Sequence, residues 1–220
     1  QSVQQWTDSM VESIRLAFKD SPVRPEQIEG VGIDGTSCTV VHLDSEGKPL
    51  RDAIMWMDIR AAKEADDIAA CGDGALKYVG HGKVSAEWFP CKNLWVKRHE
   101  PEIYAQASTI FEHTDWIAYW LTGEVTANIC TVSIRWFYNQ KEGGFPVSLY
   151  EKIGLGDIFD KLPKRVVNLG EVIGGVSAKV AALTGLREGV PVAGGGADAY
   201  MGVIGVNALK PGKLALITGS

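Results

Sequence analysis

The chain has 220 residues, of which 45% are hydrophobic and 22% are charged, and its formal net charge is −5. This composition is typical of a globular protein with room for about one domain or slightly more. It contains no basic run that would favour nucleic acid and no apolar run long enough to cross a bilayer, so neither partner is expected.

The first third of the chain predicts a long helix followed by short strands. Apolar residues recur at helical spacing over residues 2–19, and Pro22 and Pro25 end that helix. Strands are predicted at 31–33 and 39–43, a hairpin turn at 44–47 and a third extended run at 53–56. A helix predicted over 61–70 stops at Gly72, a residue type that commonly ends helices.

The rest of the chain interleaves helices with strands, which predicts the α/β class. Helices are predicted at 92–99, 101–107, 115–121, 177–184 and 198–206, and strands at 109–111, 191–193 and 214–217. Residues 124–146 are expected to be irregular, and they are rich in aromatic side chains.

The spacing of cysteine and histidine predicts neither a metal site nor a redox site. Cys38, Cys71, Cys91 and Cys130 are far apart, and the four histidines lack the spacing of metal ligands. Unpaired thiols fit a reducing compartment, so a cytoplasmic location is expected.

Asp198 is the strongest candidate for a catalytic residue. It follows three glycines at 194–196 and opens a predicted helix, which puts a carboxylate beside bare backbone N–H groups that suit an anion. A helix N-cap, worth roughly 1 kcal/mol, explains Asp198 equally well. A dinucleotide fingerprint also fits Gly194, Gly196 and Ala199, but no acidic residue follows the next predicted strand, as a nicotinamide site would need.

Two groups near the predicted hairpin have the chemistry of a sugar site. Thr36 and Ser37 lie in a turn whose hydroxyls can hold sugar or phosphate oxygens, although a plain hairpin turn is the simpler explanation. Trp56 can pack against the C–H face of a sugar, and Asp58 with Arg60 can bracket sugar hydroxyls with charge-assisted hydrogen bonds. A surface ion pair is the simpler explanation of these two charges.

Lys92, Asp115 and Trp116 stand among aromatic residues at the starts of predicted helices. A lysine in such a place is usually solvated, and Asp115 fits an N-cap.

Several segments, taken in order, resemble the FGGY carbohydrate kinases, a family within the actin-like ATPase superfamily. They are residues 32–44, 53–61, 77–88 with Lys92, 115–123, 194–202 and 216–220. Each motif alone is unspecific, but their common order and spacing are specific, and the resemblance covers almost the whole chain from residue 28 to 220.

The resemblance implies an actin-like (ribonuclease H-like) α/β domain, with a mixed β-sheet flanked by helices and incomplete at both ends. Residues 1–220 would form most of an N-terminal sugar-binding domain. A first phosphate-loop strand with a D-x-G-T motif would precede Gln1, and a C-terminal nucleotide domain would follow Ser220. Asp34-Gly35-Thr36 is not that first loop, because it lacks the residue between the aspartate and the glycine.

The implied activity is ATP-dependent phosphorylation of a terminal hydroxyl of a sugar or polyol, with a ketopentose such as ribulose or xylulose as the expected substrate. ATP and Mg²⁺ would be the cofactors, no protein-held metal site is expected, and a homodimer is an expected assembly. The resemblance makes Asp198 the general base. It assigns substrate binding to Thr36, Ser37, Trp56, Asp58, Lys92, Asp115 and Trp116, and phosphate or nucleotide binding to Gly195, Gly196, Thr218, Gly219 and Ser220.

The branch of the family stays open, as does the alternative of a non-catalytic sugar-binding relic of the same fold. Thr36-Ser37-Cys38 is similar to ribulokinases, whereas xylulokinases carry Gln-Met-His at this place. The Trp-Met-Asp-Ile-Arg segment at 56–60 is more similar to xylulokinases and ribitol kinases.

Overall fold

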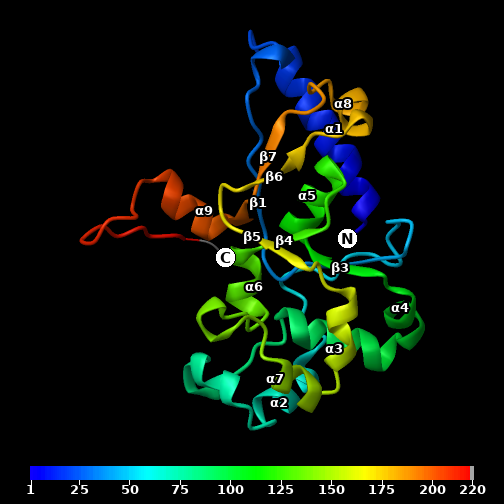
Figure 1. The fold of residues 1–220 in the computed structure, drawn as a ribbon, viewed down its shortest axis with the longest axis vertical. Helices are drawn as coiled ribbons and strands as arrows, with labels where there is room; N and C mark the ends of the chain where they lie inside the picture. Colours follow the sequence, from blue (N-terminus) through cyan, green and yellow to red (C-terminus); the bar gives the residue numbers. More distant parts are fainter. Residues whose placement is uncertain (219–220) are drawn as a thin grey trace.

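Helices and short strands alternate along residues 1–218, the part of the chain that this computed structural model describes. The molecule is elongated, with α1, α8, β6 and β7 at one end and α2, α3 and α7 at the other (Figure 1). This arrangement confirms the expected α/β class. None of the helices within residues 1–218 combines the length and the apolar character that a bilayer crossing needs.

The strands pair in both directions. β1 (Asp34–Gly35) runs parallel to β8 (Gly196–Ala197), and β4 (Thr126–Asn128) runs parallel to β5 (Arg165–Val167). β2 (Val40–Leu43) is antiparallel to β3 (Thr109–Glu112), and β6 (Val172–Gly175) is antiparallel to β7 (Pro191–Ala193). A parallel bridge between Val31 and Val192 extends the β1–β8 pairing, so residues 31–35 lie beside residues 192–197.

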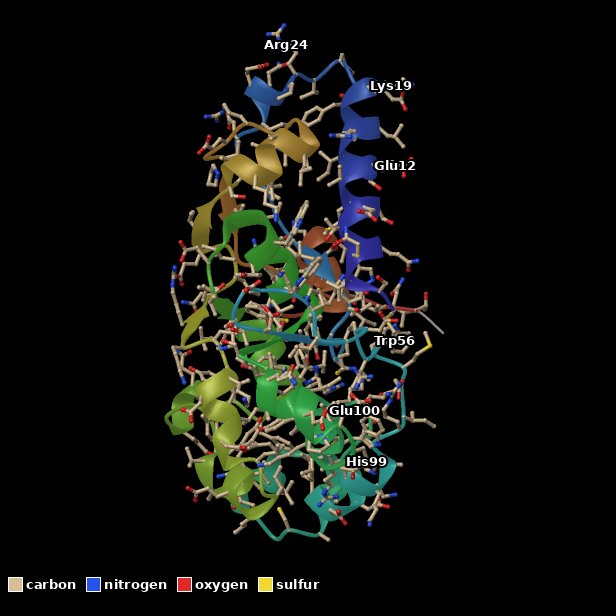
Figure 2. All side chains as sticks on the ribbon, turned by 90° about the vertical axis from the view of Figure 1, so that its right-hand side faces the viewer. Glu12, Lys19, Arg24, Trp56, His99 and Glu100 are labelled. Atoms are coloured by element: carbon tan, nitrogen blue, oxygen red, sulfur yellow. The ribbon has the colours of Figure 1, made fainter. Side chains whose placement is uncertain are left out.

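The helices are α1 (Val3–Lys19), α2 (Ala62–Ala69), α3 (Phe89–His99), α4 (Pro101–Gln106), α5 (His113–Thr122), α6 (Ile129–Arg135), α7 (Val147–Lys152), α8 (Ala178–Thr184) and α9 (Asp198–Gly205). Short 3-10 segments lie at Pro25–Gln27, Gly74–Tyr78, Gly80–Gly82, Gln140–Glu142 and Gly156–Lys161. Left-handed glycines end two helices, Gly123 after α5 with φ 81° and Gly185 after α8 with φ 85°. Figure 2 shows α1 along one edge of the molecule, with Glu12 and Lys19 on its outer side.

The core consists of separate apolar clusters. The largest lies among α2, α3, α6 and α7, where the rings of Phe89 and Trp136 stack with centroids 3.7 Å apart. A second cluster joins α5 and α8 to β6 and β7, and a third lies around Val3, Phe111 and Trp116. The β1–β8 pair lies beside these clusters and reaches the surface at its carboxyl end, where the candidate site opens.

Several element predictions were wrong in detail. Residues 124–146, expected to be irregular, contain β4 and α6, and α3 begins at Phe89 rather than Lys92. Residues 31–33 form only a single bridge. The strand predicted at 214–217 is absent, because no backbone in residues 1–218 pairs with it, and Leu214 and Leu216 are 89% and 80% exposed.

Candidate active site

A cleft of about 660 Å³ opens between the turn at residues 36–38, Trp56 and the start of α9. Its lining residues are Thr36, Ser37, Cys38, Trp56, Glu87, Arg135, Asp198, Ala199, Gly202, Ile217 and Thr218. The cleft therefore brings together five residues that were predicted from separate parts of the sequence: Thr36, Ser37, Trp56, Asp198 and Thr218. Its volume lies within the range of pockets that bind small molecules.

Asp198 is the first residue of α9, and its side chain is exposed on the cleft. The N-cap position belongs to Ala197, so the N-cap alternative for Asp198 was wrong. One carboxylate oxygen, Oδ1, accepts a hydrogen bond from the backbone N–H of Ala199 at 2.7 Å. Oδ2 has no protein partner among residues 1–218, and an acidic side chain in the first turn is stabilised by the helix dipole.

The glycines before Asp198 are needed because two backbones approach each other closely. A Cβ atom at Gly195 would overlap the carbonyl oxygen of Ile33, and one at Gly194 would lie 2.6 Å from the carbonyl oxygen of Asn168. Gly195 and Gly196 are buried and do not line the cleft. Phosphate binding by these two glycines stays a prediction, and Gly219 and Ser220 lie outside the described residues.

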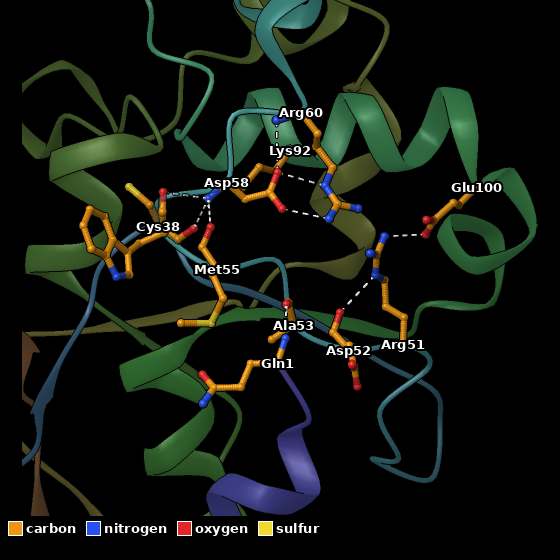
Figure 3. Close-up of polar contacts among 11 residues, drawn as sticks. Gln1, Cys38, Arg51, Asp52, Ala53, Met55, Asp58, Arg60, Lys92 and Glu100 are labelled. Atoms are coloured by element: carbon orange, nitrogen blue, oxygen red, sulfur yellow. Dashed lines mark hydrogen bonds and ion pairs between the residues drawn. The ribbon is translucent and has the colours of Figure 1, made fainter.

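Lys92 lies beneath the cleft rather than on its surface. Its side chain is fully buried, and Nζ donates hydrogen bonds to the carbonyl oxygens of Cys38 at 2.7 Å, Met55 at 2.7 Å and Trp56 at 3.2 Å (Figure 3). Burial lowers the pKa of the Lys92 ammonium. The expectation of a solvated lysine was therefore wrong. Lys92 acts on the cleft only through the backbone carbonyl groups that it binds.

Asp58 forms an ion pair with Arg60, which is the simpler of the two alternatives left by the sequence. Arg60 Nε donates to Asp58 Oδ1 at 2.9 Å and Nη2 donates to Oδ2 at 2.8 Å (Figure 3). This guanidinium holds the pKa of the Asp58 carboxyl below its usual range and also lies 4.8 Å from the ring centroid of Trp95. Asp58 does not line the cleft, so direct sugar contact by Asp58 stays a prediction.

Asp115 and Trp116 lie away from the cleft. Asp115 is within the first turn of α5, where Glu112 holds the N-cap position, so its prediction as an N-cap was wrong. Its Oδ1 accepts hydrogen bonds from the backbone N–H and the side-chain amide of Asn128 at 2.8 and 2.7 Å, and burial raises its pKa well above the ordinary value. Trp116 packs against Trp6, with ring centroids 5.5 Å apart, and lines a different hollow beside α1.

Two charged residues of the cleft were missed from the sequence. Arg135 ends α6, and its guanidinium carbon lies 5.0 Å from the ring centroid of Trp88. Glu87 precedes α3 and is half-buried. The signal for α6 was Asn128, a preferred N-cap residue, whose side chain accepts a hydrogen bond from the N–H of Thr131 at 2.8 Å.

The described residues hold no group of three or more His, Cys, Asp or Glu side chains placed to bind a metal ion. The oxygen atoms on the cleft instead suit a metal ion that binds together with the phosphates of a substrate. Asp198 brings a carboxylate and Thr218 a hydroxyl to the cleft, and Mg²⁺ is commonly held by one or two carboxylates together with substrate phosphates.

A family model described as "FGGY family of carbohydrate kinases, N-terminal domain" matches residues 1–205. The ribulokinase of Bacillus licheniformis is 31% identical to this chain, covering 98% of the chain and 42% of that protein. Ribulokinase 1 of Staphylococcus saprophyticus is 33% identical, covering 98% and 43%. Among solved structures, the xylulose kinase from Rhodospirillum rubrum has a TM-score of 0.84 at 27% identity, covering 96% of this chain and 43% of that one. The chain thus spans less than half the length of these relatives.

Proposed function

Because the chain belongs to the FGGY family of carbohydrate kinases, we propose that it forms the sugar-binding part of an enzyme that phosphorylates a sugar or polyol with ATP. The actin-like α/β fold of this family, expected from the sequence, is confirmed by the solved relatives. The observation that carries the proposal is the position of Asp198, whose carboxylate lies on the same cleft as the indole of Trp56 and the turn at residues 36–38.

Asp198 acts as the general base in this proposal. Ala199 N–H holds Oδ1, which leaves Oδ2 to accept the proton of a terminal substrate hydroxyl as that hydroxyl attacks the γ-phosphate. Phosphoryl transfer depends mainly on positioning and charge neutralisation, and a positioned base contributes on the order of 10²–10⁴ in rate. Asp198 and Thr218 are the described residues that would face ATP and Mg²⁺. When bound, Mg²⁺ neutralises charge on the phosphates.

The sugar is recognised by groups of different chemistry around the cleft. Trp56 offers an apolar face, Thr36 and Ser37 offer hydroxyls, and Arg135 with Glu87 offers opposite charges for hydrogen bonds to sugar hydroxyls. We propose a ketopentose as the substrate. The names of the similar proteins, ribulokinases and xylulose kinases, support this class. The turn Thr36-Ser37-Cys38 favours a ribulose-like sugar within it.

Further nucleotide contacts are proposed to come from a second domain, since the relatives are more than twice as long as this chain. A non-catalytic sugar-binding relic is the alternative. It predicts sugar binding without phosphate transfer, whereas the kinase predicts both.

Full-length protein assayed with ATP and a panel of ketopentoses and polyols tests the proposal. Asp198→Asn is expected to leave the Kd for the sugar within about twofold of wild type and to lower turnover by on the order of 10²–10⁴. Glu12→Gln, an exposed carboxylate on α1, is the matched control and should match wild type in both measurements. Turnover by Asp198→Asn at the wild-type rate would exclude the base role. Sugar binding without any phosphorylation by wild type would favour the relic.

A further inference from the structure

Two ionisable side chains, Lys92 and Glu112, are completely buried just below the cleft. Burying a charge is unfavourable unless hydrogen bonds or opposite charges compensate it. The two side chains form no direct ion pair within the described residues. Each is instead satisfied by groups that belong to, or adjoin, the residues lining the cleft.

Lys92 joins two walls of the cleft. The three hydrogen bonds of its ammonium end on Cys38, at the end of the turn at residues 36–38, and on Met55 and Trp56 in the facing segment. Figure 3 shows Nζ between these carbonyl groups. An ammonium has three N–H donors, so this arrangement uses all of them.

Glu112 joins the same turn to the third wall. Its Oε2 accepts a hydrogen bond from the backbone N–H of Cys38 at 2.7 Å, and its Oε1 accepts one from the indole Nε1–H of Trp136 at 2.7 Å. Trp136 directly follows Arg135, which lines the cleft. The carboxylate thus ties the end of α6 to the turn that carries Thr36 and Ser37.

Cys38 is the residue on which both side chains converge. Its φ is 64°, in the left-handed region that non-glycine residues rarely adopt. Its N–H donates to Glu112 and its carbonyl oxygen accepts from Lys92, so hydrogen bonds to two buried ionisable side chains hold both polar groups of the strained backbone. Without them, the turn would relax toward an ordinary conformation and move the hydroxyls before it.

We propose that Lys92 and Glu112 form a buried clamp on Cys38 that sets the spacing between the Thr36–Ser37 hydroxyls, Trp56 and Arg135, and thereby the fit of the sugar. Both are positioning residues that act through the backbone and Trp136, without touching substrate. The inference rests on the proposed function for its effect on the sugar, whereas the clamp itself is a property of the fold.

Glu112→Gln in the full-length protein tests the clamp. A glutamine keeps the volume but offers one acceptor oxygen instead of two, so one of the two bonds is lost. We expect KM for the sugar to rise about tenfold with kcat within about twofold of wild type. In the absence of sugar, we expect the Cys38 amide to exchange hydrogen about tenfold faster than in wild type.

Glu64→Gln is the matched control, because Glu64 is also fully buried but pairs with Arg98. It should change neither KM nor the exchange at Cys38. If Glu112→Gln does not fold, Trp136→Phe carries the test, since it keeps an aromatic ring and removes the indole donor to Glu112.

An unchanged KM in a folded, active variant would overturn the clamp, as would an unprotected Cys38 amide in wild type. A wild-type protein that phosphorylates no sugar, but whose Cys38 amide loses protection in Glu112→Gln, would refute the proposed function and leave the clamp standing.

Discussion

Replacing Glu112 with glutamine is expected to change how the free energy of unfolding depends on pH. Burial raises the pKa of the Glu112 carboxyl from its ordinary 4.5 to about 7, although the hydrogen bonds from Trp136 and Cys38 and the nearby charges of Lys92 and Arg135 oppose that rise. Between these two pH values the folded protein holds a proton that the unfolded chain has released. The stabilising contribution of Glu112 is therefore complete below about pH 4.5 and is lost as the pH rises through about 7.

The size of the effect follows from the width of this pH window. At ~1.36 kcal/mol for each pH unit, the rise from 4.5 to about 7 corresponds to about 3 kcal/mol. Glutamine does not titrate, so this dependence disappears in the variant. Relative to Glu112→Gln, wild type should lose about 3 kcal/mol of stability between pH 4.5 and pH 8.

Urea unfolding of both proteins, followed by tryptophan fluorescence at several pH values in this range, measures the difference. Groups that titrate alike in both proteins cancel. His42→Gln serves as a comparison of opposite sign, because burial lowers the pKa of His42 to about 4. Its contribution is present above the ordinary value of 6.5 and is lost as the pH falls through about 4. If the difference in free energy of unfolding between wild type and Glu112→Gln does not change with pH, the raised pKa of Glu112 is refuted.

Two further substitutions test the packing that holds the site. Phe89→Ala removes a fully buried ring stacked on Trp136 and is expected to lower the free energy of unfolding by about 3–5 kcal/mol in chemical denaturation; Tyr78→Ala, at a residue that is 60% exposed, should lower it far less, and equal losses would contradict the core assignment. Gly195→Ala places a Cβ on the carbonyl oxygen of Ile33, and we expect it to lower the free energy of unfolding by at least about 3 kcal/mol or to prevent folding. Gly202→Ala, whose Cβ would lie 3.5 Å from Ile217, is the control, and similar melting temperatures for the two variants would argue against close backbone contact at Gly195.

Local sequence patterns were sufficient where the signal itself was local. The apolar spacing predicted α1 to within a residue at its start, and the glycine turn located Asp198 at the beginning of α9. The same reasoning missed α6, because four of its seven residues are β-branched and have low helix propensity, and Arg135 was missed with it.

The buried polar contacts were beyond such reasoning. Lys92 finds its carbonyl partners 36, 37 and 54 positions away in the chain, and Glu112 reaches Cys38 from 74 positions away. A solvated lysine and a buried one have the same neighbours in sequence, so only the tertiary arrangement distinguishes them. The prediction of a strand at 214–217 was wrong for a related reason. An extended apolar run becomes a strand only when a partner pairs with its backbone.

The register of β1 and β8 fixes the distance between two residues of the proposed site. Gly35 is paired with Ala197, so the next residues, Thr36 and Asp198, leave neighbouring strands side by side at a separation governed by strand spacing, about 4.8 Å. Loop lengths elsewhere do not enter that separation. Under the proposed function, substitutions at Trp56, Glu87 and Arg135 could therefore change the preferred sugar while the carboxylate proposed to accept the proton keeps its position.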